Sequence, residues 1–173
     1  MRGFCILKID LKRAFPKLNP NLLMIAMDAK RIPREISTPL MAEILNQTTN
    51  PQWDGERIGE IKYRNGIIEG GPHSMHCLNL CLAYILEPLV SSWKRRGFDF
   101  KLKHTNDEFG DAISYPFQNW ADDVFLFSDS VSHMQIMLDE FALAIEPMGG
   151  MINEDKLEWM GIGKGMNAGI LHS

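Results

Sequence analysis

The feature that most constrains the fold of this chain is a pair of adjacent carboxylates, Asp122 and Asp123, set among strand-forming residues. The stretch around them reads NWADDVFLFSD, with aromatic and β-branched side chains close on both sides. Two neighbouring negative charges repel each other, and burial between apolar flanks increases that cost. A hairpin with the acids at its tip avoids the cost of burying them and still buries the apolar flanks, because only the flanking strands are then buried.

A third acid decides between two interpretations of that tip. Asp-Asp is common in turns, so a solvated turn is the structural alternative. The functional interpretation is a divalent cation, which makes clustered carboxylates favourable. FCILKIDL predicts a buried strand over 4–11 that carries Asp10 near its end, where a lone charge would be costly. If this strand lies beside the hairpin, three carboxylates meet at one end of a sheet, where Mg²⁺ (or Mn²⁺) could bind.

The rest of the chain predicts helices and strands in alternation. Apolar residues at helical spacing predict three helices, and alternating residues predict a hairpin that turns at Arg64-Asn65-Gly66. From Ser74 to Trp93 the chain is apolar almost all round, which predicts a central buried helix. The expected helices are 20–32, 34–48, 74–93 and 132–148, and the expected further elements are a hairpin over 56–71, a strand over 98–104, a loop over 105–111 and a strand after 150. This pattern is typical of an α+β fold with helices on one face of an antiparallel sheet.

Length and composition favour one soluble intracellular domain over residues 1–173. Three cysteines, an odd number, favour reduced thiols in the cytoplasm or nucleus. We expect no membrane helix and no secretory signal. His73, His76, Cys77 and Cys81 share one helical region, but their spacing fits no usual zinc pattern, so we expect core or groove side chains. The net charge of −4 gives no general attraction to nucleic acid.

Four ordered motifs carry a resemblance to a known family. They read KIDLKRAF at 8–15, GIIEGGPHSMHCLNL at 66–80, WADDVFLFS at 120–128 and GGMINEDKLEWM at 149–160. In order and spacing they resemble the successive palm motifs of reverse transcriptases (RNA-directed DNA polymerases), specifically the non-LTR retrotransposon type. The resemblance spans nearly the whole chain. It implies a polymerase palm with a ferredoxin-like or RRM-like core, and nucleotidyl transfer with two Mg²⁺ ions.

The resemblance also implies a role for individual residues. Asp10, Asp122 and Asp123 match the catalytic acids that hold the metal, and Leu11 would offer its backbone carbonyl to the same ion. Lys156 resembles the lysine near the triphosphate, which can protonate the leaving pyrophosphate. Without the family match, Lys156 would be a solvated surface lysine.

A second set of residues resembles the nucleotide and template contacts. Phe15 resembles the aromatic residue under the incoming sugar, whose ring would exclude a 2′-OH; a core side chain is the alternative. The remaining positions match the turn and helix that line nucleotide and template: Glu69, Gly70, Pro72, Ser74 and Asn79. The implied partners are an RNA template, a DNA primer and deoxynucleoside triphosphates.

Several positions depart from the family pattern. Glu69 stands where the family has Gln, and Ile68 where it has Arg, so template binding should be weaker. Gly71 replaces an acid, and Leu157 a Thr. We expect fingers and thumb, and any endonuclease region, to lie outside this chain, and the isolated chain to show no processive synthesis. The alternative is a degenerate or excised palm that keeps the fold and at most binds metal or nucleic acid. An unrelated metal-binding domain would require the motif order to be chance.

Overall fold

The computed structural model describes residues 3–63, 65–102 and 113–162. The loop expected over 105–111 and Arg64 of the expected turn lie outside these residues. The chain divides into two compact units. The first contains Met1–Lys12, Ile85–Glu146 and Met151–Ser173, and the second contains Arg13–Tyr84 and Pro147–Gly150. That the two units act as one domain stays a prediction.

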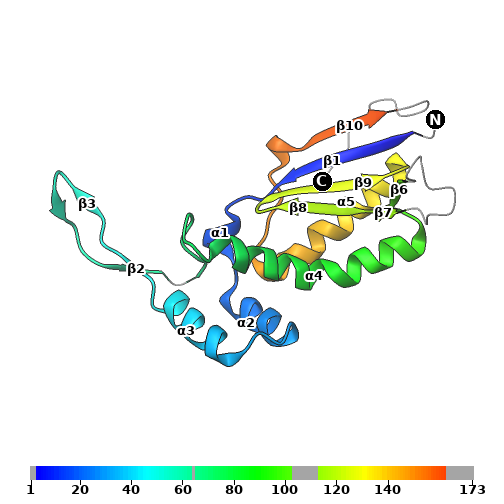
Figure 1. The fold of residues 1–173 in the computed structure, drawn as a ribbon. Coiled ribbons are helices and arrows are strands. Elements are labelled where there is room, and N and C mark those ends of the chain that lie inside the picture. The colour runs from blue at the N-terminus through cyan, green and yellow to red at the C-terminus, as the bar shows by residue number, and fades with distance from the viewer. Residues whose placement is uncertain (1–2, 64, 103–112, 163–173) are drawn as a thin grey trace. The chain divides into compact units, whose positions relative to one another are not determined.

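The first unit is built on a four-stranded antiparallel sheet in the order β10-β1-β9-β8 (Figure 1). The strands are β1 (Phe4–Asp10), β8 (Phe117–Trp120), β9 (Asp123–Ser128) and β10 (Glu158–Ile162). The N-terminal strand β1 is therefore central, between the acidic hairpin and the last strand. A separate two-stranded ladder pairs β6 (Phe100–Leu102) with β7 (Ile113–Tyr115).

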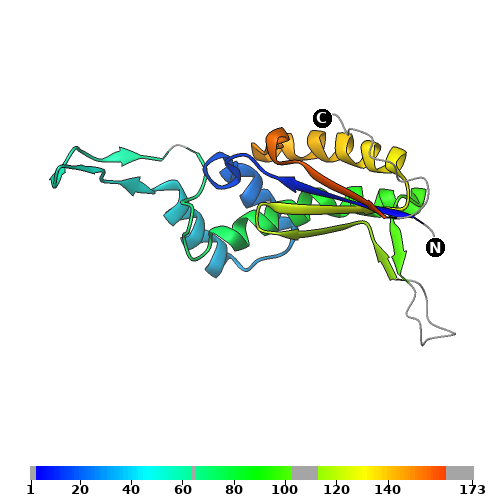
Figure 2. The ribbon, with the colours of Figure 1, turned by 90° about the horizontal axis from the view of Figure 1, so that it is seen from above.

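Strict alternation along the strands gives the sheet a buried and an open face. In β1, Cys5, Leu7 and Ile9 are buried, whereas the residues between them are half-buried. β9 alternates in the same way. Helix α5 (Val131–Ile145) packs on the buried face against β9 and β1, on one side of the strands in Figure 2. The α+β prediction, with helices on a face of an antiparallel sheet, is confirmed.

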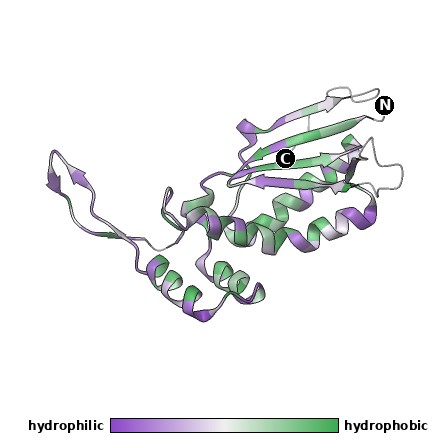
Figure 3. Ribbon diagram, in the orientation of Figure 1, coloured by the Kyte–Doolittle hydropathy of each residue, from purple (hydrophilic) through white to green (hydrophobic). Residues whose placement is uncertain are grey.

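The second unit contains short helices, the start of a long helix and a two-part hairpin. The helices are α1 (Ala14–Lys17), α2 (Pro20–Ala29) and α3 (Arg34–Leu45), and α4 (Ser74–Arg96) begins here and continues in the first unit. The hairpin pairs β2 (Thr48–Thr49) with β5 (Ile61–Lys62) and β3 (Gln52–Trp53) with β4 (Glu56–Arg57). Figure 3 shows β3 and β4 as hydrophilic, in contrast to the hydrophobic β1 and β9.

The hairpin predicted to turn at Arg64-Asn65-Gly66 is wrong. The chain reverses at Asp54-Gly55 instead, where both residues have positive φ, at 50° and 80°. Asp-Gly is a preferred pair for such a turn. Gly66 serves a different purpose, because a Cβ there would lie 2.3 Å from the carbonyl oxygen of Pro16. Its N–H donates to the Leu18 carbonyl at 3.0 Å, so the glycine permits close backbone packing on α1.

The sequence predicts a central buried helix over 74–93, but α4 buries only part of its surface. Its fully buried side chains form one stripe, which comprises Cys77, Leu78, Cys81, Leu82, Leu86 and Trp93. Among the described residues, α4 is the one helix long and apolar enough to cross a membrane by length and composition. The core helix of a soluble protein passes the same test, so this is weak support for a membrane span.

Candidate active site at the end of the sheet

The acidic pair lies at the tip of the β8–β9 hairpin, as the sequence predicts. Trp120 and Asp123 are register partners, so Ala121 and Asp122 form the turn. Ala121 takes a left-handed φ of 54°, a conformation that is strained for a residue with a side chain. The Leu11 N–H donates to the Asp122 carbonyl at 3.2 Å and ties this turn to the end of β1.

The pairing of β1 with β9 places the third acid beside the turn. Asp10 is the direct register partner of Asp123. Side chains of directly opposed residues in an antiparallel pair lie on the same face, within contact of each other. The face is the open one, since both residues are half-buried and alternate with buried neighbours. The structure therefore brings Asp10, Asp122 and Asp123 to one end of the sheet.

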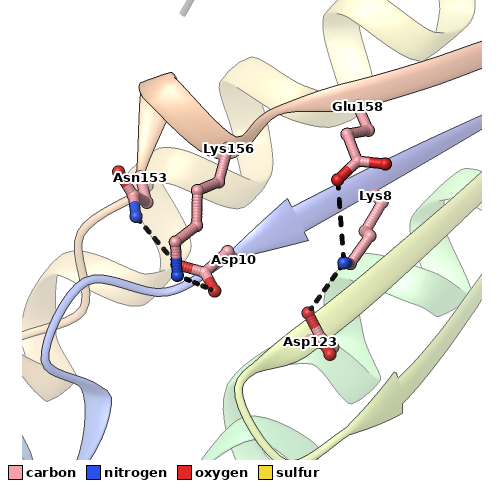
Figure 4. A network of polar contacts seen from close by, with 6 residues as sticks. All are labelled: Lys8, Asp10, Asp123, Asn153, Lys156 and Glu158. Atoms are coloured by element: carbon pink, nitrogen blue, oxygen red, sulfur yellow. Dashed lines mark hydrogen bonds and ion pairs between the residues drawn. The ribbon is translucent and has the colours of Figure 1, made fainter.

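Asp10 is held by two donors from the segment before β10 (Figure 4). Lys156 Nζ lies 3.0 Å from Asp10 Oδ1, and Asn153 Nδ2 donates to Oδ2 at 2.9 Å. The backbone adds a further tie, because the Asn153 N–H donates to the Asp10 carbonyl at 2.8 Å. Only 16% of the Asp10 side chain is exposed, against 62% for Lys156.

These contacts shift both titrations. Burial acts to raise the pKa of Asp10, but the hydrogen bonds from Asn153 and Lys156, with the charges of Lys156 and Lys8, outweigh it and lower that pKa. The pKa of Lys156 is raised, first by its hydrogen bond to Asp10 and also by the charges of Asp122 and Asp123. One ammonium group therefore feels all three carboxylates.

A second lysine neutralises the other side of the site. Lys8 Nζ lies 3.6 Å from Asp123 Oδ1 and 3.9 Å from Glu158 Oε1 (Figure 4). Lys8 precedes Asp10 by two residues, so strand alternation puts both on the open face. Glu158 of β10 is the register partner of Lys8.

Sequence reasoning missed Lys8, Asn153 and Glu158. Lys8 could have been found from the two-residue spacing to Asp10 within a strand. Asn153 lies in the motif at 149–160, in which the resemblance implies a role for Lys156 alone. The position of Glu158 depends on the β1–β10 register, which no local pattern shows.

The donor chemistry of this corner fits a hard divalent ion, because carboxylate oxygens are the ligands that Mg²⁺ and Mn²⁺ prefer. The arrangement is less complete. Within the described ranges, no group of three or more His, Cys, Asp and Glu side chains is placed to hold a metal ion. Both oxygens of Asp10 already accept hydrogen bonds from side chains. The metal roles of Asp10, Leu11, Asp122 and Asp123, and the catalytic role of Lys156, stay predictions.

The predicted nucleotide and template residues lie in the second unit. Phe15 is half-buried in α1, and its carbonyl accepts a hydrogen bond from the Ile67 N–H at 2.9 Å. That bond places Phe15 next to the segment that begins at Gly66. The contacts of the predicted nucleotide and template residues with nucleotide or template stay predictions.

The turn before α4 is ordered by a serine. Ser74 is buried, and its hydroxyl donates to the Ile68 carbonyl at 2.5 Å. Gly70 has a φ of +78°, and a Cβ on Gly71 would lie 2.7 Å from Ser74 Oγ. The glycine at position 71, where the family has an acid, therefore leaves room for the Ser74 hydroxyl. Glu69 and Pro72 are exposed, and Asn79 is half-buried.

The cysteines of α4 are buried thiols. Burial raises the pKa of Cys77 to about 11 and that of Cys81 to about 12, with nearby Glu43 and Cys77, respectively, adding to the shift. His73 and His76 are exposed at the start of α4. Both thiols are buried in the core, as expected for these two side chains.

Comparison with known proteins agrees with the recognised motifs. A family model described as "Reverse transcriptase (RNA-dependent DNA polymerase)" matches residues 3–164. A search of curated proteins finds no match.

Solved structures with a similar fold include telomerases of two yeasts. Apo telomerase from Candida tropicalis, truncated from its C-terminal domain, has a TM-score of 0.64 and 12% identity over 97% of this chain and 32% of that one. Telomerase from Candida tropicalis in complex with a TWJ fragment of telomeric RNA has a TM-score of 0.68 and 12% identity over 95% of this chain and 27% of that one. The Candida albicans telomerase complex has a TM-score of 0.64 and 12% identity. This chain thus spans about a third or less of those proteins, and the likeness concerns the fold.

Proposed function

This chain belongs to the reverse transcriptase (RNA-dependent DNA polymerase) family, and on that premise we propose that it is the palm of a non-LTR retrotransposon reverse transcriptase. Family membership implies RNA-templated DNA synthesis. The proposed partners are an RNA template, a DNA primer and deoxynucleoside triphosphates, with fingers, thumb or endonuclease regions in a longer natural protein. The proposed location is the cytoplasm or nucleus.

The observation that supports this most is the register pairing of Asp10 with Asp123, beside the turn that holds Asp122. Two β-strands fix the two carboxylates on one face, and Asp122 is held in place through its carbonyl. In the proposed reaction the primer 3′ oxygen attacks the α-phosphorus, and the bond to the β-phosphate breaks to release pyrophosphate. Divalent ions, when bound, would neutralise the charge on the attacking and leaving oxygens.

The residues of the chain supply positioning and one proton. Asp10, Asp122 and Asp123 would hold the ions. Lys156, whose pKa is raised by Asp10, Asp122 and Asp123, would protonate the leaving pyrophosphate. Its raised pKa keeps the Lys156 side chain protonated near pH 7, as a proton donor must be.

Primer extension on poly(rA)–oligo(dT), resolved one nucleotide at a time, tests this function. We expect addition of the first deoxythymidylate without processive synthesis, because net charge −4 gives weak grip on the template. Asp122→Asn should abolish that addition. Equal signal from the wild type and Asp122→Asn would contradict the proposal.

The degenerate palm is the second candidate, and one observation favours it. Lys156 and Asn153 bind both oxygens of Asp10. Among the residues that the structure describes, no three His, Cys, Asp or Glu side chains are placed to hold a metal ion. A degenerate palm would fold and give no addition of even one nucleotide, with Mn²⁺ as well as with Mg²⁺.

A further inference from the structure

The corner formed by β1, β9 and β10 carries its own counterions. Lys156 Nζ lies 3.0 Å from Asp10 Oδ1, and Lys8 Nζ lies 3.6 Å from Asp123 Oδ1 (Figure 4). We infer that Lys156 and Lys8 are tethered cations that stabilise the acidic site without metal, and that a divalent ion binds by displacing them. This inference rests on the proposed function, because it concerns the same carboxylates.

Displacement follows first from the contacts of Asp10. One of its oxygens faces the Lys156 ammonium and the other faces the Asn153 amide. Each oxygen keeps a second lone pair. A divalent ion bound there would nevertheless lie next to an ammonium group, and like charges at such short range repel strongly. The Lys156 side chain therefore has to leave before Asp10 can coordinate a metal, and its 62% exposure leaves it room to do so.

Lys8 forms a weaker ion pair with the Asp123 carboxylate than Lys156 forms with Asp10. Its contact with Asp123 is longer than that of Lys156 with Asp10, and the Asp123 side chain is 40% exposed. Lys8 also has a second acid within reach, Glu158 at 3.9 Å. An ion that takes Asp123 would leave Lys8 paired with Glu158, so displacement of Lys8 should be easier than displacement of Lys156.

A lysine that competes for the carboxylate lowers the apparent metal affinity. The apparent affinity equals the intrinsic affinity multiplied by the fraction of molecules in which the lysine has released the carboxylate. Exposed ion pairs are weak, whereas a pair with short hydrogen bonds to a largely buried carboxylate is stronger. We expect Lys156→Met to raise Mn²⁺ affinity about threefold to tenfold and Lys8→Met about twofold. The gain should be larger in the double variant than in either single variant.

The test is a Mn²⁺ titration of the 173-residue protein, with free Mn²⁺ followed by electron paramagnetic resonance. Lys94→Met is the matched control, because it removes the same charge from an exposed position in the last turn of α4. Lys156→Gln provides a second substitution should the Met variant fold poorly. The rise in melting temperature on adding Mn²⁺, a readout independent of activity, should follow the same order as affinity.

The outcomes separate this inference from the proposed function. Tighter Mn²⁺ binding in the Lys156 variants than in the wild type, with Lys94→Met unchanged, supports the inference. Measurable binding in the Lys156 variants supports it equally if the wild type binds too weakly to measure. Unchanged affinity in both lysine variants, or no binding in any of them, overturns it. If Asp10→Asn abolishes binding and nucleotide addition while the lysine variants match the wild type, the proposed function stands and the inference falls.

Discussion

Glu140 and Asp10 each accept hydrogen bonds from one basic side chain and one further donor, yet they sit in contrasting parts of the first unit. Glu140 joins two helices: it accepts from the Trp93 indole N–H of α4 at 2.7 Å and from both Arg96 amino groups, one of them at 2.9 Å. Asp10 ends a strand on the open face and accepts from a lysine and an amide.

The chemistry of the donor decides what each network can do. The guanidinium of Arg96 presents a planar fork that matches both oxygens of Glu140, and Trp93 is fully buried. Lys156 is a point charge on a flexible stem. An arginine fork suits a permanent joint between helices, whereas a lysine suits a position that another cation can take over.

The largest expected effect comes from breaking the site carboxylate. Asp10→Asn removes a proposed metal ligand, which supplies several kcal/mol of charge stabilisation, so single-nucleotide addition should fall at least about 100-fold. Gel-resolved primer extension measures it. Circular dichroism should show that the fold persists. Retained addition in Asp10→Asn would place the chemistry elsewhere.

Breaking the helix joint should instead affect stability. Glu140→Ala leaves the buried Trp93 N–H without its acceptor, so the free energy of unfolding should fall by about 2 kcal/mol, measured by urea denaturation. Asp139→Ala, at the neighbouring exposed position, is the matched control and should change it by less than about 0.5 kcal/mol. Similar losses in the two variants would remove the distinction between the networks.

Exchanging the basic side chains sharpens the comparison further. Lys156→Arg should pair more firmly with Asp10 and lower Mn²⁺ affinity about threefold, measured by the same titration. Stronger Mn²⁺ binding in Lys156→Arg would contradict the idea of a competing cation.

Arg96→Lys should lose the planar fork that binds both oxygens of Glu140 and lower the free energy of unfolding by about 1 kcal/mol, measured by urea denaturation.

The smallest effect is on pH dependence. The pKa of Asp10 is lowered in the folded state, so its contribution to stability is present above the ordinary value of 3.8 and is lost as pH falls through the lowered pKa. The pKa of Glu140 is lowered too, first by the Arg96 hydrogen bond, from the ordinary value of 4.5. Both Asp10→Asn and Glu140→Gln should therefore flatten the acid limb of a stability–pH curve from urea denaturation. A steeper acid limb in either variant would contradict these directions.

Local pattern was enough for much of the fold. The short apolar run in FCILKIDL predicts β1, and helical spacing predicts α2, α3 and α5 to within a few residues. The two glycines after α5 mark its end, where Gly149 has a φ of +83°. These predictions succeed because period and end signals lie within a few residues of one another.

The hairpin of the second unit shows where local pattern is insufficient. Asn65-Gly66 and Asp54-Gly55 are both strong turn signals, and only packing selects between them. Gly66 is needed where the backbone approaches Pro16, so its turn signal has a different cause. The burial of α4 is likewise decided by neighbours, since an apolar helix can turn only one stripe toward a core of limited size.

By itself the sequence determined the acidic hairpin tip, the third acid at the end of a buried strand, and the ordered motifs that mark the family. Only the tertiary structure decided the strand order β10-β1-β9-β8 and with it the partners of each charge. Lys156 and Asp10 are 146 positions apart in the sequence, and Lys8 of β1 contacts Asp123 on the neighbouring strand β9. Period and propensity act over a few residues, whereas register between distant strands is set by burying one face of the whole sheet.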